Sequence, residues 1–126
     1  GDQQSGLSIS YDRHLYMTAA GQLTFGTYPG SVSVVTSPLS YNNGLWHHAV
    51  VSQDAAGMRL YVDASLVASN SNPNAQVFAG YVRVGGDNLQ GWPGQPANYF
   101  TGDLDEVAYY PVALRDDQIL KHYSLR

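Results

Sequence analysis

Residues 46–63 read WHHAVVSQDAAGMRLYVD, and this stretch decides the fold. Apolar and polar residues alternate on both sides of Asp54–Gly57, a segment with the composition of a tight turn. Met58, Leu60 and Val62 fall on one face of the second half, because side chains in a strand repeat with period two. The stretch therefore predicts two β-strands joined by a hairpin turn. A lone hairpin is only marginally stable, so the flanking segments must supply more strands and a second layer.

The flanking segments carry the same kind of pattern. Alternation and β-branched runs predict extended segments, and glycine, proline and asparagine mark the turns between them. The further extended segments are 7–17, 22–28, 31–36, 66–68, 81–84 and 101–110, the last with a bulge near Asp105–Glu106. Residues 113–123 have apolar side chains at helical spacing and early acidic residues, which predicts a C-terminal helix. About eight short strands and one helix are typical of an all-β sandwich.

Composition excludes several classes of partner. The length of 126 residues fits one domain, 1–126. A net charge of −4, with 6 lysines and arginines and no basic run, argues against nucleic acid. No window is long and apolar enough to predict membrane insertion. The absence of cysteine excludes disulfides and thiolate metal sites. A polar, tyrosine-rich β-protein of this kind fits an extracellular or surface-displayed location better than the cytoplasm.

Three motifs in order connect the chain with a known family. They are YNNGLWHHAVV at 41–51, GMRLYVDASLVA at 57–68 and GDLDEVAYYPVAL at 102–114. Together they resemble the motifs of laminin-G-like, concanavalin A-like domains, and YVRVGGDNLQGW at 81–92 is similar to a bacterial subgroup found in secreted proteins. The resemblance implies an all-β jelly-roll β-sandwich with one short C-terminal helix. It also implies a non-catalytic carbohydrate-binding or adhesion module of a secreted or surface protein.

Members of that family normally have one or two more strands before the position of Gly1. Without cover, such a gap leaves a sheet edge open. Three explanations stay open: a fragment truncated at its N-terminal side, a neighbouring subunit that supplies or covers the edge, or a rearranged segment before Tyr11 that caps it. The second explanation accompanies an alternative function, as a structural or decoration component of a cell-surface or virion assembly.

Acidic residues near the last expected strand raise the question of glycoside hydrolysis. Related sandwich glycosidases carry a Glu-x-Asp-x-x-Glu strand whose carboxyls act as nucleophile and general acid. Asp103, Asp105 and Glu106 stand here in the order Asp-Leu-Asp-Glu, and no second glutamate lies three residues beyond Asp105. We therefore expect that the protein is not an enzyme. The alternative role of Asp105 is to accept hydrogen bonds from backbone groups, with Glu106 in solvent.

Calcium is the one cofactor that the resemblance suggests, because many relatives bind it at a rim of the sandwich. Asp87, Asn88 and Asp105 are the best oxygen donors near that end, and oxygen is the ligand that Ca²⁺ prefers. No Asp-x-Asp-x-Asp-Gly loop accompanies them. The sequence therefore makes Ca²⁺ a candidate cofactor rather than a required one.

Aromatic residues in two segments predict a site for a glycan or protein ligand. Sugars stack their C–H faces on tryptophan and tyrosine while neighbouring polar groups bind their hydroxyls. Trp92 and Tyr99 lie in the longest expected loop, and Tyr11, Arg13 and His14 form a second cluster. If both segments share one face, they form a groove. The competing interpretation is that Trp92 only pins its loop to the edge of the sandwich.

Overall fold

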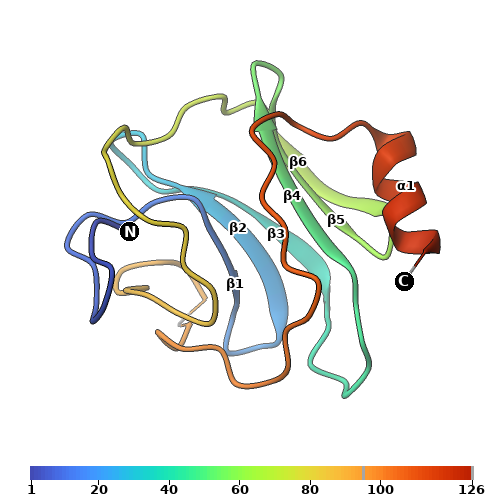
Figure 1. Cartoon of the computed structure of the whole chain (residues 1–126), viewed down its shortest axis with the longest axis horizontal. Helices are drawn as coiled ribbons and strands as arrows, with labels where there is room; N and C mark the ends of the chain where they lie inside the picture. Colours follow the sequence, from blue (N-terminus) through green and yellow to red (C-terminus); the bar gives the residue numbers. More distant parts are fainter. Residues whose placement is uncertain (95, 126) are drawn as a thin grey trace.

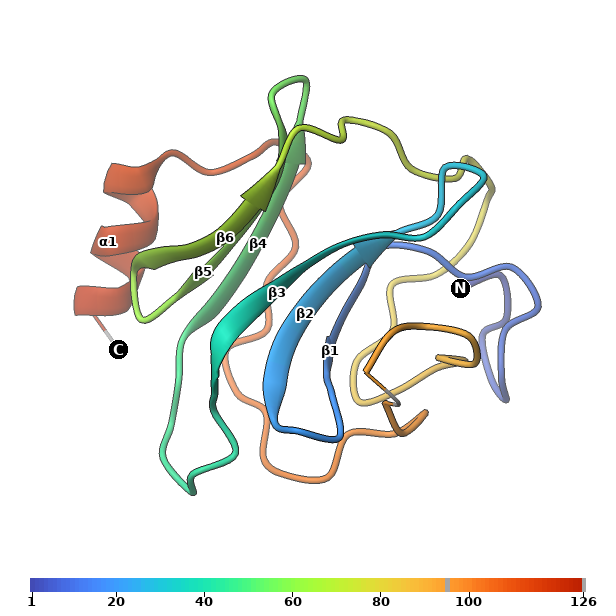
Figure 2. The ribbon, with the colours of Figure 1, turned by 180° about the vertical axis from the view of Figure 1, so that it is seen from behind.

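The computed structural model describes residues 1–94 and 96–125 and is a sandwich of two three-stranded antiparallel sheets (Figures 1 and 2). Sheet A has the order β1-β2-β3, formed by His14–Met17, Gln22–Thr27 and Ser33–Ser40. Sheet B has the order β4-β5-β6, formed by Ala49–Asp54, Gly57–Val62 and Ser65–Asn70. Helix α1, Asp116–Ser124, follows near the C-terminal end of the chain.

The predicted hairpin is confirmed as β4 and β5. The two strands pair with Val51 opposite Leu60, and Asp54 faces Gly57 at the turn. Gly57 has a φ of 117°, a conformation that glycine adopts without steric cost. Strand β4 begins at Ala49, so the residues just before it belong to the preceding loop.

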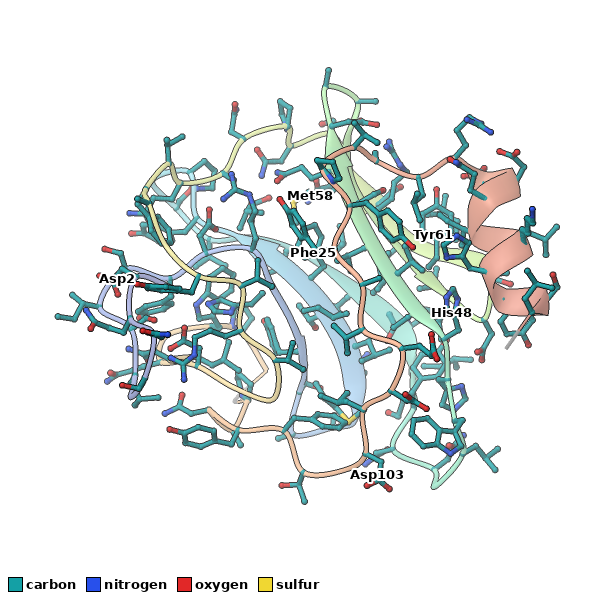
Figure 3. All side chains as sticks on the ribbon, in the orientation of Figure 1. Asp2, Phe25, His48, Met58, Tyr61 and Asp103 are labelled. Carbon is teal, nitrogen blue, oxygen red and sulfur yellow. The ribbon has the colours of Figure 1, made fainter. Side chains whose placement is uncertain are left out.

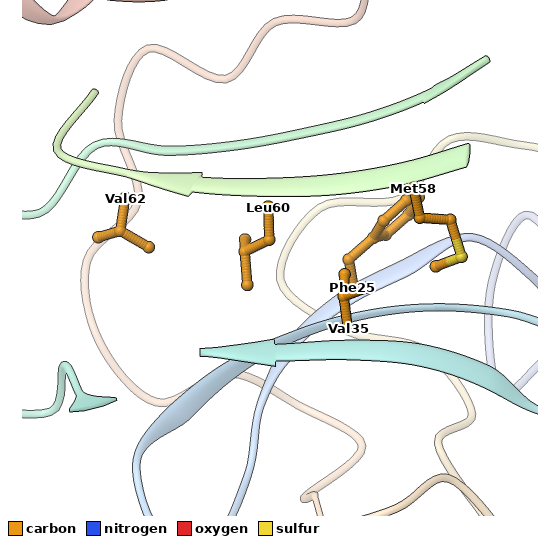
Figure 4. Close-up of a cluster of buried hydrophobic side chains, with 5 residues drawn as sticks. All are labelled: Phe25, Val35, Met58, Leu60 and Val62. Atoms are coloured by element: carbon orange, nitrogen blue, oxygen red, sulfur yellow. The ribbon is translucent and has the colours of Figure 1, made fainter. Parts of the chain in front are cut away.

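The main core lies between the two sheets, where β2 and β3 of sheet A face β5 of sheet B (Figure 4). Each of its members is at most 5% exposed. The members are Phe25, Val35, Met58, Leu60 and Val62. Complete burial of one such side chain stabilises a fold by about 1.5–3 kcal/mol, so this cluster holds the two sheets together.

Helix α1 covers the outer face of sheet B (Figures 1 and 2). Ile119 is fully buried, and the Tyr61 hydroxyl of β5 donates to Asp116 Oδ1 at 2.8 Å. Acidic residues in the first turn and basic residues in the last turn suit the helix dipole. The predicted helix at 113–123 is confirmed, with a start three residues later. The described part of the chain contains no helix that is long and apolar enough to cross a bilayer.

Two expected strands are absent from the described residues. Segments 81–84 and 101–110 run outside both sheets. A strand needs a neighbour for its N–H and C=O groups, and the described part of 101–110 makes no backbone hydrogen bond to another segment. The bulge expected at Asp105–Glu106 is therefore missing too. Within the described residues, the sandwich has six strands instead of about eight.

Candidate functional site

The outer face of sheet A carries the loop that contains Trp92. The Trp92 side chain is 6% exposed and packs in a second, smaller cluster with Tyr16 and Leu89. Its ring meets the His14 ring edge-on at 5.1 Å between centroids and the Tyr16 ring at 6.1 Å. Gly26 in β2 makes room for this ring, because a Cβ at that position would overlap it. The loop is thus seated on sheet A through Trp92.

The expected role of Trp92 as a stacking platform is corrected by this packing. A ring that is 6% exposed has no free face for a sugar. The physical reason is that the ring packs on β2, in the space that a side chain in place of Gly26 would fill. Trp92 anchors its loop to the sandwich, as the competing interpretation held.

A pocket of about 270 Å³ opens beside Trp92, and we call it the aromatic–amide pocket. Its walls come from the N-terminal segment, the loop after β2, one residue of the long connection after β6, and the Trp92 loop. Its lining residues are Ile9, Ser10, Tyr11, Tyr28, Val32, Gln76, Gln90, Gly91 and Trp92. None of these residues is charged, and the combination of aromatic rings with a few amides is typical of small-molecule sites.

Asp12 holds the walls of the aromatic–amide pocket together. Its Oδ1 accepts the backbone N–H of Tyr28 at 2.6 Å, and its Oδ2 accepts that of Gln76 at 2.5 Å. Hydrogen bonds to a charged acceptor are stronger than neutral ones, so this carboxylate fixes both walls. The sequence contained no signal for this role, because both partners are backbone groups far along the chain.

The pocket contains some of the predicted ligand residues and leaves others out. Tyr11 and Trp92 both line it, and the Tyr11 hydroxyl donates to the Gln90 carbonyl at 3.1 Å. Tyr28 is 42% exposed and supplies an accessible ring to the pocket. From the sequence it was predicted only as the last residue of the extended segment 22–28. Tyr99 is exposed and forms an isolated backbone bridge outside the pocket. The expected pairing of Tyr99 with the Tyr11 cluster is therefore corrected.

Arg13 and His14 support the pocket without lining it. Arg13 Nη1 donates to the Gln76 carbonyl at 3.3 Å and lies 3.9 Å from Asp12 Oδ2. The His14 ring lies behind the pocket, 5.8 Å from the Tyr11 ring and against Trp92. Burial lowers the pKa of His14 from 6.5 to about 4, although nearby carboxylates act in the opposite direction. At neutral pH, His14 is therefore an uncharged packing residue.

The residues predicted to bind calcium have other partners. Asp87 is buried, and its oxygens accept from the Ser8 backbone at 2.8 Å, the Ser8 hydroxyl at 2.7 Å and Arg83 at 2.9 Å. Burial alone would raise the pKa of Asp87, but the hydrogen bonds from Ser8 and Asn88 and the Arg83 charge hold it below its usual value. Asp105 is exposed, and the described residues contain no group of three or more acidic or histidine side chains fit for a metal. The donor set Asp87, Asn88 and Asp105 does not fit Ca²⁺, and Asp87 instead ties the N-terminal segment to the long loop.

The acidic residues considered for hydrolysis lie on the exposed segment 101–110. Asp103 stands at the edge of the molecule (Figure 3). Asp105 Oδ1 accepts the backbone N–H of Glu106 at 2.8 Å, the kind of backbone partner expected for it. None of the three carboxylates lines the aromatic–amide pocket. That the protein is not an enzyme stays a prediction.

A larger cleft of about 610 Å³ lies between β5 and the start of α1. Four of the five charged groups that line it form pairs, Arg59 with Asp54 and Arg115 with Asp117 at 3.0 Å, and the fifth, Asp116, accepts from the Tyr61 hydroxyl at 2.8 Å. Such exposed pairs are of little energetic worth, but they leave few unpaired polar groups for a ligand. We therefore place the candidate site at the aromatic–amide pocket.

Comparisons with known proteins agree with the architecture. A crystal structure of an S-layer domain-containing protein from Clostridium thermocellum, residues 221–444, matches with a TM-score of 0.57 at 18% identity. The match covers 82% of this chain and 52% of the other, so the chain spans about half the length of that structure. At this identity the likeness shows the fold alone. No curated protein matches the chain.

A family model matches nearly the whole chain. It is a laminin G model described as the concanavalin A-like lectin/glucanases superfamily, and it covers residues 2–120. The match includes all three motifs that suggested the resemblance, and the two facing sheets with one C-terminal helix agree with it. The chain therefore belongs to the laminin G family of the concanavalin A-like superfamily, with the all-β jelly-roll sandwich that its sequence predicted.

Proposed function

We propose that the chain is a non-catalytic recognition module that binds a carbohydrate in the aromatic–amide pocket. The lining of this pocket is the observation that supports the proposal. Tyr11 and Tyr28 provide aromatic rings for the C–H faces of a sugar. Gln76 and Gln90 provide amides, which both donate and accept hydrogen bonds and so suit hydroxyl groups. Fixed walls lower the entropic cost of binding, and Asp12 supplies that rigidity.

A glycan array, followed by titration of the best ligands, tests this proposal. Tyr28→Ala removes the more accessible ring and is expected to weaken binding roughly 3- to 10-fold, since a ring contact is worth about 0.5–1.5 kcal/mol. Tyr109→Ala is the matched control, because Tyr109 is 74% exposed and lies outside the pocket. The control should bind like the wild type. Equal losses in both variants, or no binding to any glycan on a broad array, would reject the proposal.

A second candidate function is that of a structural component of a cell-surface assembly. The solved neighbour is named as an S-layer domain-containing protein. In addition, the segment 101–112 exposes five large apolar side chains, each between 42% and 74% exposed. They are Leu104, Val107, Tyr109, Tyr110 and Val112. Exposed apolar chain of this kind is suited to contact with another protein, for example by addition to a sheet edge.

Light scattering after size exclusion tests the assembly function. An assembling chain is expected to show a mass that rises with concentration and falls to that of a monomer in Val107→Asp. A monomer at every concentration would reject this function and leave carbohydrate binding in place. Both candidate functions suit an extracellular or surface-displayed protein, and we propose that location with them.

A further inference from the structure

We propose that the ligand of the aromatic–amide pocket is an uncharged pyranose that carries a methyl group, as in a 6-deoxyhexose or an N-acetylhexosamine. This inference rests on the proposed carbohydrate function and narrows it to one class of sugar. Three properties of the pocket support it: the absence of charge, the small volume, and the two aliphatic side chains in its lining.

The charge of the pocket excludes acidic and basic sugars. No lining residue is charged. Asp12 accepts the backbone N–H of two lining residues, and its side chain has no exposed surface. Asp2 accepts the backbone N–H of Ile9 at 2.9 Å and Arg13 donates to the Gln76 carbonyl, and neither residue lines the pocket. A carboxylate or ammonium group on the ligand would lose water here without gaining a charged partner.

The volume limits the ligand to one sugar ring. At about 270 Å³, the pocket lies below the range of about 300–1,000 Å³ that is usual for drug-sized ligands. A single pyranose fits this space, with the rest of any glycan chain in solvent. The bound group is therefore a terminal or branching residue rather than the middle of an extended strand.

Two aliphatic side chains in the lining of the pocket select the methyl group. Ile9 is 82% exposed and Val32 is 39% exposed, and both line the pocket. The amides of Gln76 and Gln90 supply the polar contacts. A hydroxymethyl group pressed against the aliphatic side chains would lose hydrogen bonds to water, whereas a methyl group would bury apolar surface on both partners.

Titrations of matched sugars, followed by ligand-observed NMR, test the inference. L-fucose is compared with L-galactose, L-rhamnose with L-mannose, and N-acetyl-D-glucosamine with N-formyl-D-glucosamine. In at least one pair, the methyl-bearing sugar is expected to bind about tenfold more tightly, the low end of what one group in an apolar pocket can discriminate. The first two pairs report a 6-deoxy methyl, and the third reports an acetamido methyl. D-glucuronate should bind more weakly than D-glucose.

Substitutions at the pocket assign the preference to its aliphatic side chains. Ile9→Ser should bring the ratio within the preferred pair close to one. Ile9 is so exposed that this change leaves the packing of the fold intact. Leu45→Ser is the matched control, since Leu45 is 70% exposed and lies outside the pocket, and it should keep the tenfold ratio.

The outcomes distinguish a failure of the methyl preference from a failure of the carbohydrate function. Measurable binding with ratios near one in all three pairs would overturn the methyl preference and leave the carbohydrate function standing. Tightest binding of D-glucuronate would overturn it as well, as would a tenfold ratio that survives both Ile9→Ser and Val32→Ser. Binding of no sugar at all would remove the proposed function and this inference together.

Discussion

Mild acid is expected to destabilise the fold through His14. Burial lowers the pKa of His14 from 6.5 to about 4 in the folded protein. Between these two values the unfolded chain binds a proton that the folded chain does not, so acid favours unfolding. The contribution to stability is complete above pH 6.5 and is lost as the pH falls from 6.5 to about 4. At about 1.4 kcal/mol per pH unit, the free energy of unfolding should fall by roughly 2 kcal/mol at about pH 5.

Urea unfolding at about pH 7.5 and about pH 5 measures this loss, because both values lie above the usual pKa values of carboxyl groups, which stay mostly ionised. Trp92 fluorescence is the natural signal, since its ring is buried against His14. Trp46 is 63% exposed and would add a background that changes little on unfolding. The substitution Trp46→Phe removes this signal, so that the tryptophan emission comes from Trp92 and reports how its loop packs on sheet A.

Substitution separates His14 from the other histidines. His14→Phe keeps a ring against Trp92 and Tyr11 but cannot bind a proton, so the loss of about 2 kcal/mol on acidification should disappear. His122→Gln is the control, because His122 is exposed on α1, and this variant should keep the wild-type dependence on pH. Equal dependence on pH in the wild type and in His14→Phe would refute the reasoning.

Three further outcomes are expected. Gly26→Ala should displace the Trp92 ring, lower the free energy of unfolding by about 1–3 kcal/mol and shift the Trp92 emission to the red. An unshifted spectrum would show that the Trp92 ring does not pack against Gly26. Asp12→Asn removes a charged acceptor for two backbone N–H groups and should cost about 1–3 kcal/mol in thermal unfolding while weakening sugar binding; a wild-type melting curve would show that Asp12 does not hold the walls. EDTA should leave the melting temperature unchanged, because Asp87 is already occupied by protein donors; a lowered melting temperature, with calcium found by elemental analysis, would overturn that expectation.

The hairpin and the core could be predicted from the sequence because they depend on local order. Period two sets which face each side chain takes, and Met58, Leu60 and Val62 are buried as that rule requires. Whether a strand finds a neighbour is not a local property. Segments 81–84 and 101–110 have the composition of strands. In the described structure the first exchanges backbone hydrogen bonds with Gly1 at Tyr81, outside both sheets, and the second makes none to another segment, so the same rule overestimated the number of strands.

The candidate site was predictable only in part, for a similar reason. Tyr11 and Trp92 belong to one pocket, as their polar and aromatic surroundings suggested. The role of Trp92 depends on what lies beneath it, and that is Gly26, a residue without a side chain. The hydrophobic pattern of a sequence does not show where a glycine leaves room for a distant side chain, so the sequence could not distinguish an exposed Trp92 ring from a packed one.

The two buried aspartates explain why the pocket suits a neutral ligand. In a sequence alone, a carboxylate beside aromatic residues is a candidate ligand for a metal or a sugar, because its hydrogen-bond partners within the protein are not known. Asp12 and Asp87 instead accept backbone N–H groups from other segments of the chain, and they tie the N-terminal segment to the long loops. Buried carboxylates are stable only when paired in this way. Asp12, the acid that fixes the walls, is therefore unavailable to a ligand, and in the proposed site recognition falls to rings, amides and aliphatic groups.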